Sequence, residues 1–264
     1  MRLKITHKTE YQYDQPIRYG LQRLRLTPVS SPLQTVLDWS LTVEGAKEEV
    51  RFVDHFGNHA RLVSIGSAAK SISVLAKGEV ETFDKAGMSG AHQGFAPLWL
   101  FMHDTPLTER GEAVAALVAA LPSGTDIERL HALTAEIGVR VAYKPGETAV
   151  GTTAEQALAV GAGVCQDHAH VFCAVARALG YPARYVSGYL LMEGQVEQVA
   201  SHAWAEAHVP GLGWVAFDPA NGISPDERYV TLAVGRDYKD AMPVSGILLG
   251  QAEERLEVRI TVEQ

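Results

Sequence analysis

The sequence predicts an α+β protein in which an all-β unit over residues 1–88 precedes a mixed unit over residues 89–264. Short segments of alternating apolar and polar residues fill the first 85 positions, as in a β-sandwich or compact barrel. Helix-capping motifs then dominate residues 105–161, and an apolar helix and an alternating hairpin follow. This order is typical of a helical layer packed against an antiparallel sheet.

Six segments of the β unit alternate between apolar and polar residues: 3–13, 21–26, 36–43, 50–56, 59–65 and 71–80. Gly57 and Asn58 separate two of them and predict a tight hairpin turn. Residues 87–104, rich in glycine and aromatic residues, are expected to connect the two units. Residues 228–234 and 255–262 alternate as well. The last segment could close the later sheet or return to the β unit, and the sequence leaves this open.

Three helix starts are expected between the units. Thr105 followed by Pro106 predicts a helix that runs to Leu121. The capping boxes Thr-Asp-Ile-Glu at 125–128 and Thr-Ala-Glu-Gln at 153–156 predict helices that end near residues 138 and 161.

A cysteine stands where a loop of small residues meets the most apolar helix of the chain. The segment 161–182 reads G-A-G-V-C-Q-D-H-A-H-V-F-C-A-V-A-R-A-L-G-Y-P. A helix N-terminus favours negative charge, and the thiolate is the nucleophilic form of cysteine, so Cys165 is a candidate nucleophile. Gly161 and Gly163 are expected to let another backbone or a substrate approach it. Cys173, eight residues further on, is expected to lie in the core.

Two alternating runs after this helix predict a β-hairpin. In residues 201–209 one face carries His202, Trp204, Glu206 and His208. After the turn residues P-G-L-G, the run 214–218 places Asp218 at its end, before Pro219. If His208 lies opposite Trp214, His202 and Asp218 are diagonal neighbours, roughly 7–8 Å apart at Cα, and their side chains can meet.

These residues together indicate nucleophilic catalysis. Each alone has a plain structural explanation: a buried cysteine, a partly buried histidine and a turn-forming aspartate before proline. In the order Cys165, His202, Asp218 they match the arrangement in which a base lies beside a nucleophile and a third group orients the base.

Four motifs carry a family resemblance: G-V-C-Q-D-H-A-H at 163–170, R-Y-V-S-G-Y at 184–189, S-H-A-W-A-E at 201–206 and G-W-V-A-F-D-P at 213–219. The chain resembles the transglutaminase-like superfamily of cysteine enzymes, and more narrowly its bacterial members with a β-rich N-terminal domain. The resemblance implies a papain-like core with Cys165 as nucleophile, His202 as base and Asp218 as orienting acid. It also implies that residues 235–243, a polar loop by composition, form a wall of the active-site cleft.

The expected reaction is acyl transfer through a thioester, with hydrolysis of a peptide or amide bond favoured. The backbone N–H of Cys165 is one expected oxyanion donor. Candidates for the second donor or for substrate contacts are Gln156, Tyr143, Gln166 and Trp204. The alternatives are protein-glutamine transamidation, an acyltransferase such as the arylamine N-acetyltransferases, which the H-A-W and W-V-A-F-D-P contexts disfavour, and a non-catalytic peptide-binding module, which the intact motifs disfavour.

No metal or cofactor is expected. Cys165, Asp167, His168 and His170 offer ligand atoms, but their spacing spreads them over more than one face of a helix, and no paired metal motif is present. Some cross-linking members of the superfamily are activated by calcium. This sequence contains no acidic calcium-binding loop of EF-hand form. The expected partner is a peptide or protein substrate, and the oligomeric state is left open.

Composition bounds the partners and compartment. The net charge is −8, and residues 91–264 carry 11 Lys and Arg against 21 Asp and Glu, so no basic stripe for nucleic acid is present. No apolar run is long enough to cross a membrane, and the first ten residues lack a signal-peptide core. Two cysteines fit a reducing compartment. We therefore expect a cytoplasmic protein.

Overall fold

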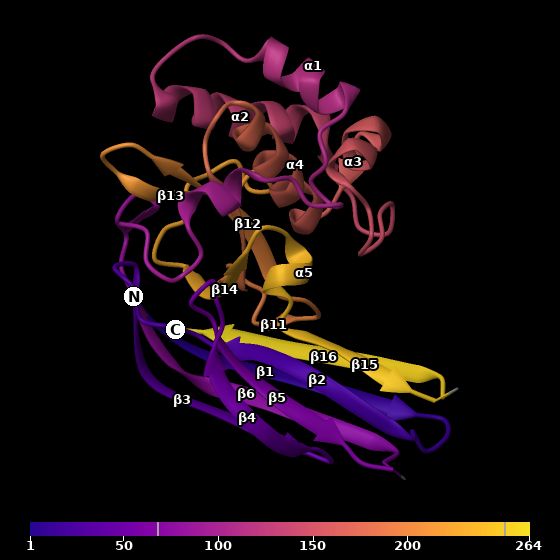
Figure 1. Cartoon of the computed structure of the whole chain (residues 1–264). Helices are drawn as coiled ribbons and strands as arrows, with labels where there is room; N and C mark the ends of the chain where they lie inside the picture. Colours follow the sequence, from indigo (N-terminus) through magenta and orange to yellow (C-terminus); the bar gives the residue numbers. More distant parts are fainter. Residues whose placement is uncertain (68, 251) are drawn as a thin grey trace.

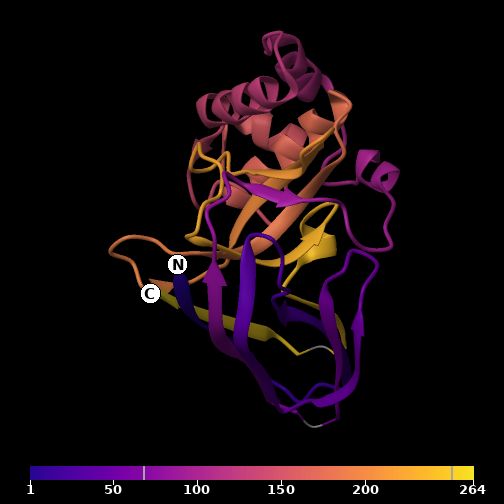
Figure 2. The same cartoon turned by 90° about the vertical axis from the view of Figure 1, so that its left-hand side faces the viewer.

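The computed structural model describes residues 1–67, 69–250 and 252–264 and has two units stacked end to end. Figure 1 shows a long β unit, a second sheet beside it and a layer of helices beyond that sheet. Figure 2, turned by 90°, places the helices at the end of the molecule opposite the β unit. The α+β architecture predicted from the sequence is confirmed.

The β unit is a sandwich of two antiparallel sheets. In spatial order the first contains β11 (Glu197–Gln198), β16 (Glu254–Glu263), β1 (Arg2–Tyr13), β6 (Ser71–Thr82) and β3 (Gln34–Glu44). The second contains β15 (Val244–Leu249), β2 (Tyr19–Thr27), β5 (His59–Ile65) and β4 (Lys47–Val53). Apolar residues of both sheets share one core, which includes Leu3, Ile5, Leu24, Val63 and Val74.

Each of the six expected strand segments contains a strand, and the boundaries differ by up to three residues. β4 ends at Val53 and not at residue 56, because Asp54 begins the turn: its backbone C=O accepts the N–H of Gly57. Gly57 has a φ of 91°, in the left-handed region that favours glycine, so the Gly57-Asn58 hairpin is confirmed.

The end of the chain returns to the β unit. β16 pairs with β1 from Lys4↔Glu263 to Tyr13↔Glu254, and β15 pairs with β2. The two termini therefore lie side by side (Figure 1). Residues 244–263 complete the sheets that begin at the N-terminus, and the predicted boundary at residues 88 and 89 marks only the first passage between the units.

The second sheet has the antiparallel order β14 (Tyr229–Gly235), β10 (Ala183–Leu190), β12 (His202–Val209), β13 (Gly213–Phe217) and β7 (Met88–Gly90). β12 and β13 pair with His208 opposite Trp214, the register predicted from the alternation. Ala203, Ala205 and Ala207 face the helical layer, and Trp204 and Trp214 pack in a separate cluster.

The helical layer contains α1 (Glu112–Ala120), α2 (Asp126–Arg140), α3 (Ala154–Val160) and α4 (Cys165–Ala178), and β8 (Ala142–Tyr143) pairs in parallel with β9 (Ala162–Gly163) beside it. Both predicted capping boxes are present, on α2 and α3. α4 is buried along nearly all of its length, as its apolar sequence predicts, and Cys173 is fully buried in the core.

The helix predicted from Thr105 is wrong at its start, because α1 begins seven residues later, at Glu112. The segment 105–108 forms a turn instead, in which the Thr108 N–H donates to the Thr105 carbonyl. The Thr108 hydroxyl also accepts a hydrogen bond from Arg177 of α4, 2.7 Å away. Glu155 fixes the later start, because its carboxylate accepts the N–H groups of residues 111, 113 and 114.

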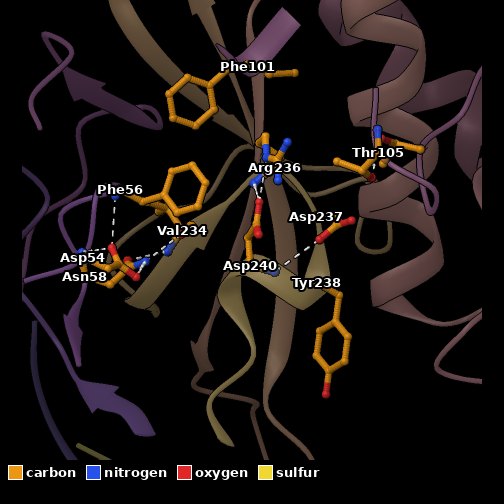
Figure 3. A network of polar contacts seen from close by, with 12 residues as sticks. Asp54, Phe56, Asn58, Phe101, Thr105, Val234, Arg236, Asp237, Tyr238 and Asp240 are labelled. Carbon is orange, nitrogen blue, oxygen red and sulfur yellow. Dashed lines mark hydrogen bonds and ion pairs between the residues drawn. The ribbon is translucent and has the colours of Figure 1, made fainter. Parts of the chain in front are cut away.

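The segment 235–243, expected as a polar loop, contains the one-turn helix α5 (Tyr238–Ala241). Asp237 caps this helix by accepting the Asp240 N–H, and Arg236 pairs with Asp240 at 2.8 Å (Figure 3). Asp237 is buried, so the segment is not simply an exposed loop. The capping aspartate and the ion pair are the local reason for the helical turn.

Two buried side-chain amides join the units along the edge strand β14. Asn58 donates to the Val234 carbonyl and accepts the Val234 N–H, both at 2.8 Å (Figure 3). Gln34 makes the same pair of contacts with Thr231, at 2.8 and 2.7 Å. These amides satisfy the backbone groups that an edge strand leaves unpaired, so the β unit covers the free edge of the second sheet.

Candidate active site

Cys165 is the first residue of α4 and its side chain is partly exposed. The helix start is fixed by Asp167, whose Oδ2 accepts the Val164 N–H at 2.8 Å and the Thr148 hydroxyl at 2.7 Å. N–H groups in the first turn of a helix have no carbonyl partner within the helix. The thiol therefore lies beside free backbone donors that can stabilise negative charge.

Gly163 and Gly161 each have a structural role beside Cys165. A Cβ atom built on Gly163 would lie 2.7 Å from Asp167 Oδ2, so the missing side chain makes room for the capping carboxylate. Gly161 has a φ of 70° and ends α3 in the left-handed conformation.

His202 and Asp218 meet at the end of the hairpin. His202 Nε2 lies 2.6 Å from Asp218 Oδ2, and both side chains are buried. His202 begins β12 and Asp218 directly follows β13, so the register of the hairpin brings them together. Because Nε2 is occupied by the carboxylate, Nδ1 is the ring nitrogen available to Cys165.

Two residues that the sequence analysis did not identify complete the surroundings of Asp218. The Tyr229 hydroxyl donates to Oδ2 at 2.8 Å, and Asn221 Nδ2 donates to the same oxygen at 2.7 Å. Oδ1 accepts the backbone N–H groups of Ala220 and Asn221, at 3.0 and 3.3 Å. No local sequence signal identifies these two residues as functional. Asn221 follows Asp218 by three residues and resembles a turn residue, and Tyr229 begins a strand and resembles a core residue.

The electrostatics of the pair favour a charged imidazole. Burial alone would lower the pKa of His202, but the interactions with Asp218 and Cys165 outweigh it and raise the pKa to about 10. Burial would likewise raise the pKa of Asp218, but hydrogen bonds from His202, Asn221 and Tyr229 lower it. At neutral pH the arrangement is therefore an imidazolium held by a carboxylate, beside the sulfur atom of Cys165.

Two of the other candidates, Trp204 and Tyr143, lie near the His202–Asp218 pair. The Trp204 ring stacks on His202 with 6.1 Å between ring centroids, and it is almost fully buried. Tyr143, 55% exposed, stands over His168. Burial raises the pKa of the Tyr143 hydroxyl, and the nearby Cys165 and Asp218 raise it further, so Tyr143 borders the site.

Gln156 and Gln166 both make local contacts. Gln156 Oε1 accepts the Thr153 N–H at 3.0 Å as part of the capping box of α3. Gln166 Nε2 donates to the Val150 carbonyl at 3.1 Å. Each keeps part of its amide for other partners, so their expected roles stay predictions.

The side chains considered as metal ligands have protein partners. Asp167 caps α4, both ring nitrogens of His168 lie 2.8 Å from backbone carbonyls, and His170 Nε2 accepts the Tyr238 N–H at 3.1 Å. Within residues 1–67, 69–250 and 252–264, no group of three or more His, Cys, Asp or Glu side chains is placed to hold a metal ion. Across the same residues, none of the helices combines the length and the apolar character that a membrane span requires.

Comparison with protein families gives two adjacent matches. Residues 115–219, which include Cys165, His202 and Asp218, match the model described as the transglutaminase-like superfamily. Residues 3–81 match the model described as the bacterial transglutaminase-like N-terminal region.

The relatives match this chain over different lengths. An uncharacterized protein of Mycobacterium leprae is 28% identical, with 99% of this chain and 98% of the relative covered. A protein-glutamine gamma-glutamyltransferase of Pseudomonas aeruginosa is 38% identical over 71 residues, which is 24% of this chain and 11% of that protein. The crystal structure of a candidate cysteine protease from Cytophaga hutchinsonii superposes with a TM-score of 0.78 at 24% identity, covering 100% of this chain and 91% of that one, which shows a common fold.

Proposed function

Because the chain belongs to the transglutaminase-like superfamily, we propose that it is a cysteine-dependent acyl-transfer enzyme that hydrolyses peptide or amide bonds through a thioester. The observation that carries the proposal is the His202–Asp218 contact of 2.6 Å, in a buried pair whose imidazole interacts with Cys165. This is the chemistry of a nucleophile activated by an oriented base.

In the first half-reaction the Cys165 thiolate attacks the carbonyl carbon of the substrate. A C–S bond forms, and the carbonyl electron pair moves onto oxygen, where N–H groups of the first turn of α4 can receive it. The tetrahedral intermediate collapses as the C–N bond breaks, and His202 gives its proton to the leaving amine. The product is a thioester, and His202 is left neutral.

In the second half-reaction water attacks the thioester and His202 takes up its proton. The C–S bond breaks, the acid leaves, and the thiolate–imidazolium pair is restored. Asp218 stays ionised throughout and holds the orientation of the ring. Its five donors, from His202, Asn221, Tyr229 and the backbone, support this role.

A second oxyanion donor is proposed to be Tyr143. Its side chain is 55% exposed, and its hydroxyl lies within electrostatic range of Cys165. Gln156 Oε1 is engaged in the capping box of α3, and the Trp204 ring is buried in the aromatic cluster against His202. The loss of one oxyanion donor typically raises the barrier by about 3–4 kcal/mol.

Transamidation is the second candidate, supported by the 71-residue similarity to a protein-glutamine gamma-glutamyltransferase. It would share every step up to the thioester and would then use an amine in place of water. The two outcomes differ by the mass of the product.

The test is mass spectrometry after incubation with a pool of glutamine-containing peptides and a primary amine. Cleaved or deamidated peptides that are absent with Cys165→Ala would support the hydrolase, and amine-bearing peptides the transferase. Identical profiles for wild type and Cys165→Ala across the pool would contradict both, and would favour a peptide-binding module.

A further inference from the structure

A cavity of about 170 Å³ lies at the junction of the β unit and the second sheet. β1 and β16 of the β unit form one wall, through the cross-strand pairs Thr9–Val258 and Tyr11–Leu256. Ser201 and Tyr238 also line the cavity. The cavity is therefore built by segments from both ends of the chain and by the core between them.

Two residues that line the cavity, Ser201 and Tyr238, connect it to the candidate active site. Ser201 directly precedes His202 in the chain. The Tyr238 ring lies 6.1 Å from the Tyr185 ring. Burial raises the pKa of Tyr185, and Cys165 is close enough to raise this pKa further. In Figure 3 the Tyr238 ring points away from the Arg236–Asp240 pair. Ser201 on one side, and Tyr238 with Tyr185 on the other, therefore connect the cavity to the residues of the candidate active site.

The lining of the cavity carries no Asp, Glu, Lys or Arg. Its one imidazole, His7, has both ring nitrogens in use: Nδ1 lies 2.9 Å from the Tyr189 hydroxyl and Nε2 lies 3.1 Å from Thr9 Oγ1. Burial lowers the pKa of His7 to about 4, so the ring is neutral at pH 7. A charged group placed there would lose its hydration without gaining a counter-charge.

The size of the cavity suits one side chain. Its volume equals that of about five or six liquid waters and is below the roughly 300–1,000 Å³ of sites that enclose whole small ligands. Val199, 86% exposed, stands at the rim and extends the apolar surface outward.

We propose that this cavity is a specificity subsite that holds one large uncharged side chain, aliphatic or aromatic, of the acyl-donor peptide. The inference rests on the proposed function. It gives the β unit a part in substrate selection, because Thr9, Tyr11 and Val258 form the wall against which the side chain packs.

The test uses peptides that differ at one position at a time, with Phe, Leu, Ala, Glu or Lys on either side of the attacked amide. Wild type should prefer Phe or Leu over Glu and Lys at one position, by tenfold or more in kcat/KM. Val258→Phe, which fills the half-buried edge of the cavity, should reduce kcat/KM for the Phe and Leu peptides at least tenfold and leave the Ala peptide unchanged.

The matched control is Val50→Phe on β4, where Val50 is 45% exposed, lies in the other sheet of the β unit and does not line the cavity. It should leave every peptide unchanged. Equal turnover of all peptides by wild type, or an equal loss for all of them in Val258→Phe, would overturn the subsite. The rate at which iodoacetamide labels Cys165 should not change in either variant, because a small reagent does not use the cavity.

Binding separates failure of the subsite from failure of the proposed function. If wild type turns over no peptide, the same peptides are titrated against Cys165→Ala and against Cys165→Ala with Val258→Phe. A preference for Phe and Leu that the second substitution removes would support the subsite although the proposed function had failed. Equal binding of all peptides would overturn the subsite.

Discussion

The carboxylate of Asp167 occupies the space that a side chain on Gly163 would need. Asp167 Oδ2 would lie 2.7 Å from a Cβ at position 163, and this same oxygen accepts the Val164 N–H. The glycine and the aspartate together thus define where α4 begins. Because Cys165 is the first residue of that helix, they also define where the thiol lies.

Gly163→Ala should therefore destabilise the protein and displace Cys165. Asp167 Cβ would also be 2.7 Å from the new methyl group, so relief requires movement of the helix start and not only of a flexible side-chain end. We expect the free energy of unfolding to fall by about 1–3 kcal/mol, measured by denaturant titration. Gly151→Ala, with no atom within 4 Å of its Cβ, is the control. Equal stability of the two variants would contradict this account.

The two cysteines should differ sharply in their reactivity towards an alkylating reagent. Cys165 is partly exposed at a helix N-terminus, whereas Cys173 is fully buried and its burial raises the pKa of the thiol to about 12. Intact mass measurement should find one iodoacetamide adduct on the native protein and two after denaturation. Native Cys165→Ala should take up none. An adduct on native Cys173 would show that the core opens on the timescale of labelling.

Asp218→Asn should move the alkaline limb of activity to lower pH. In the folded wild type the pKa of His202 is about 10, above the ordinary 6.5, and Asp218 contributes to the increase. The proton needed by the leaving amine is therefore lost only as pH rises through the higher value. Without the carboxylate the limb should shift downward, and kcat/KM near neutral pH should fall roughly 10²- to 10⁴-fold. An unchanged limb would assign the titration to another group.

The raised pKa of His202 should also make the free energy of unfolding depend on pH. Since the pKa of His202 is higher in the folded state, its contribution is complete below pH 6.5 and is lost as pH rises towards 10. The free energy of unfolding of wild type should decline over this window more steeply than that of His202→Gln. Denaturant titrations of both proteins at pH 6.5, 8 and 9.5 measure the difference, and parallel declines would contradict it.

Tyr229→Phe should weaken catalysis without abolishing it. The variant removes one donor to Asp218 Oδ2 and leaves those of His202 and Asn221. A hydrogen bond to a charged group is worth about 1.5–3 kcal/mol, so kcat/KM should fall roughly tenfold to a hundredfold if the loss is expressed in the transition state. Tyr181→Phe, which removes a 2.7 Å bond to Asp126 away from the site, should leave kcat/KM unchanged. Equal effects would indicate loss of stability alone.

Local patterns determined much of this molecule in advance. Alternation of period two located β1 to β6, the hairpin β12–β13, β14 and β16. A turn of fixed length set His208 opposite Trp214, and this register brought His202 to Asp218. The capping boxes located α2 and α3 because a cap is a contact between residues three positions apart. The helix start at Cys165 followed from the step between small residues and an apolar run.

What only the tertiary structure decided depends on contacts between distant segments. Glu155 accepts N–H groups at the start of α1 and so sets where this helix begins. Tyr229 and Asn221 donate to Asp218, and β16 pairs with β1 at the other end of the chain. No local period encodes such contacts, because each arises when separately formed elements pack and must satisfy the polar groups that packing buries. The sequence by itself thus determined most strands of the β unit, the helices α2, α3 and α4, the hairpin register and the order Cys165, His202, Asp218. Packing alone decided which groups surround the carboxylate and which strands border the cavity beside it.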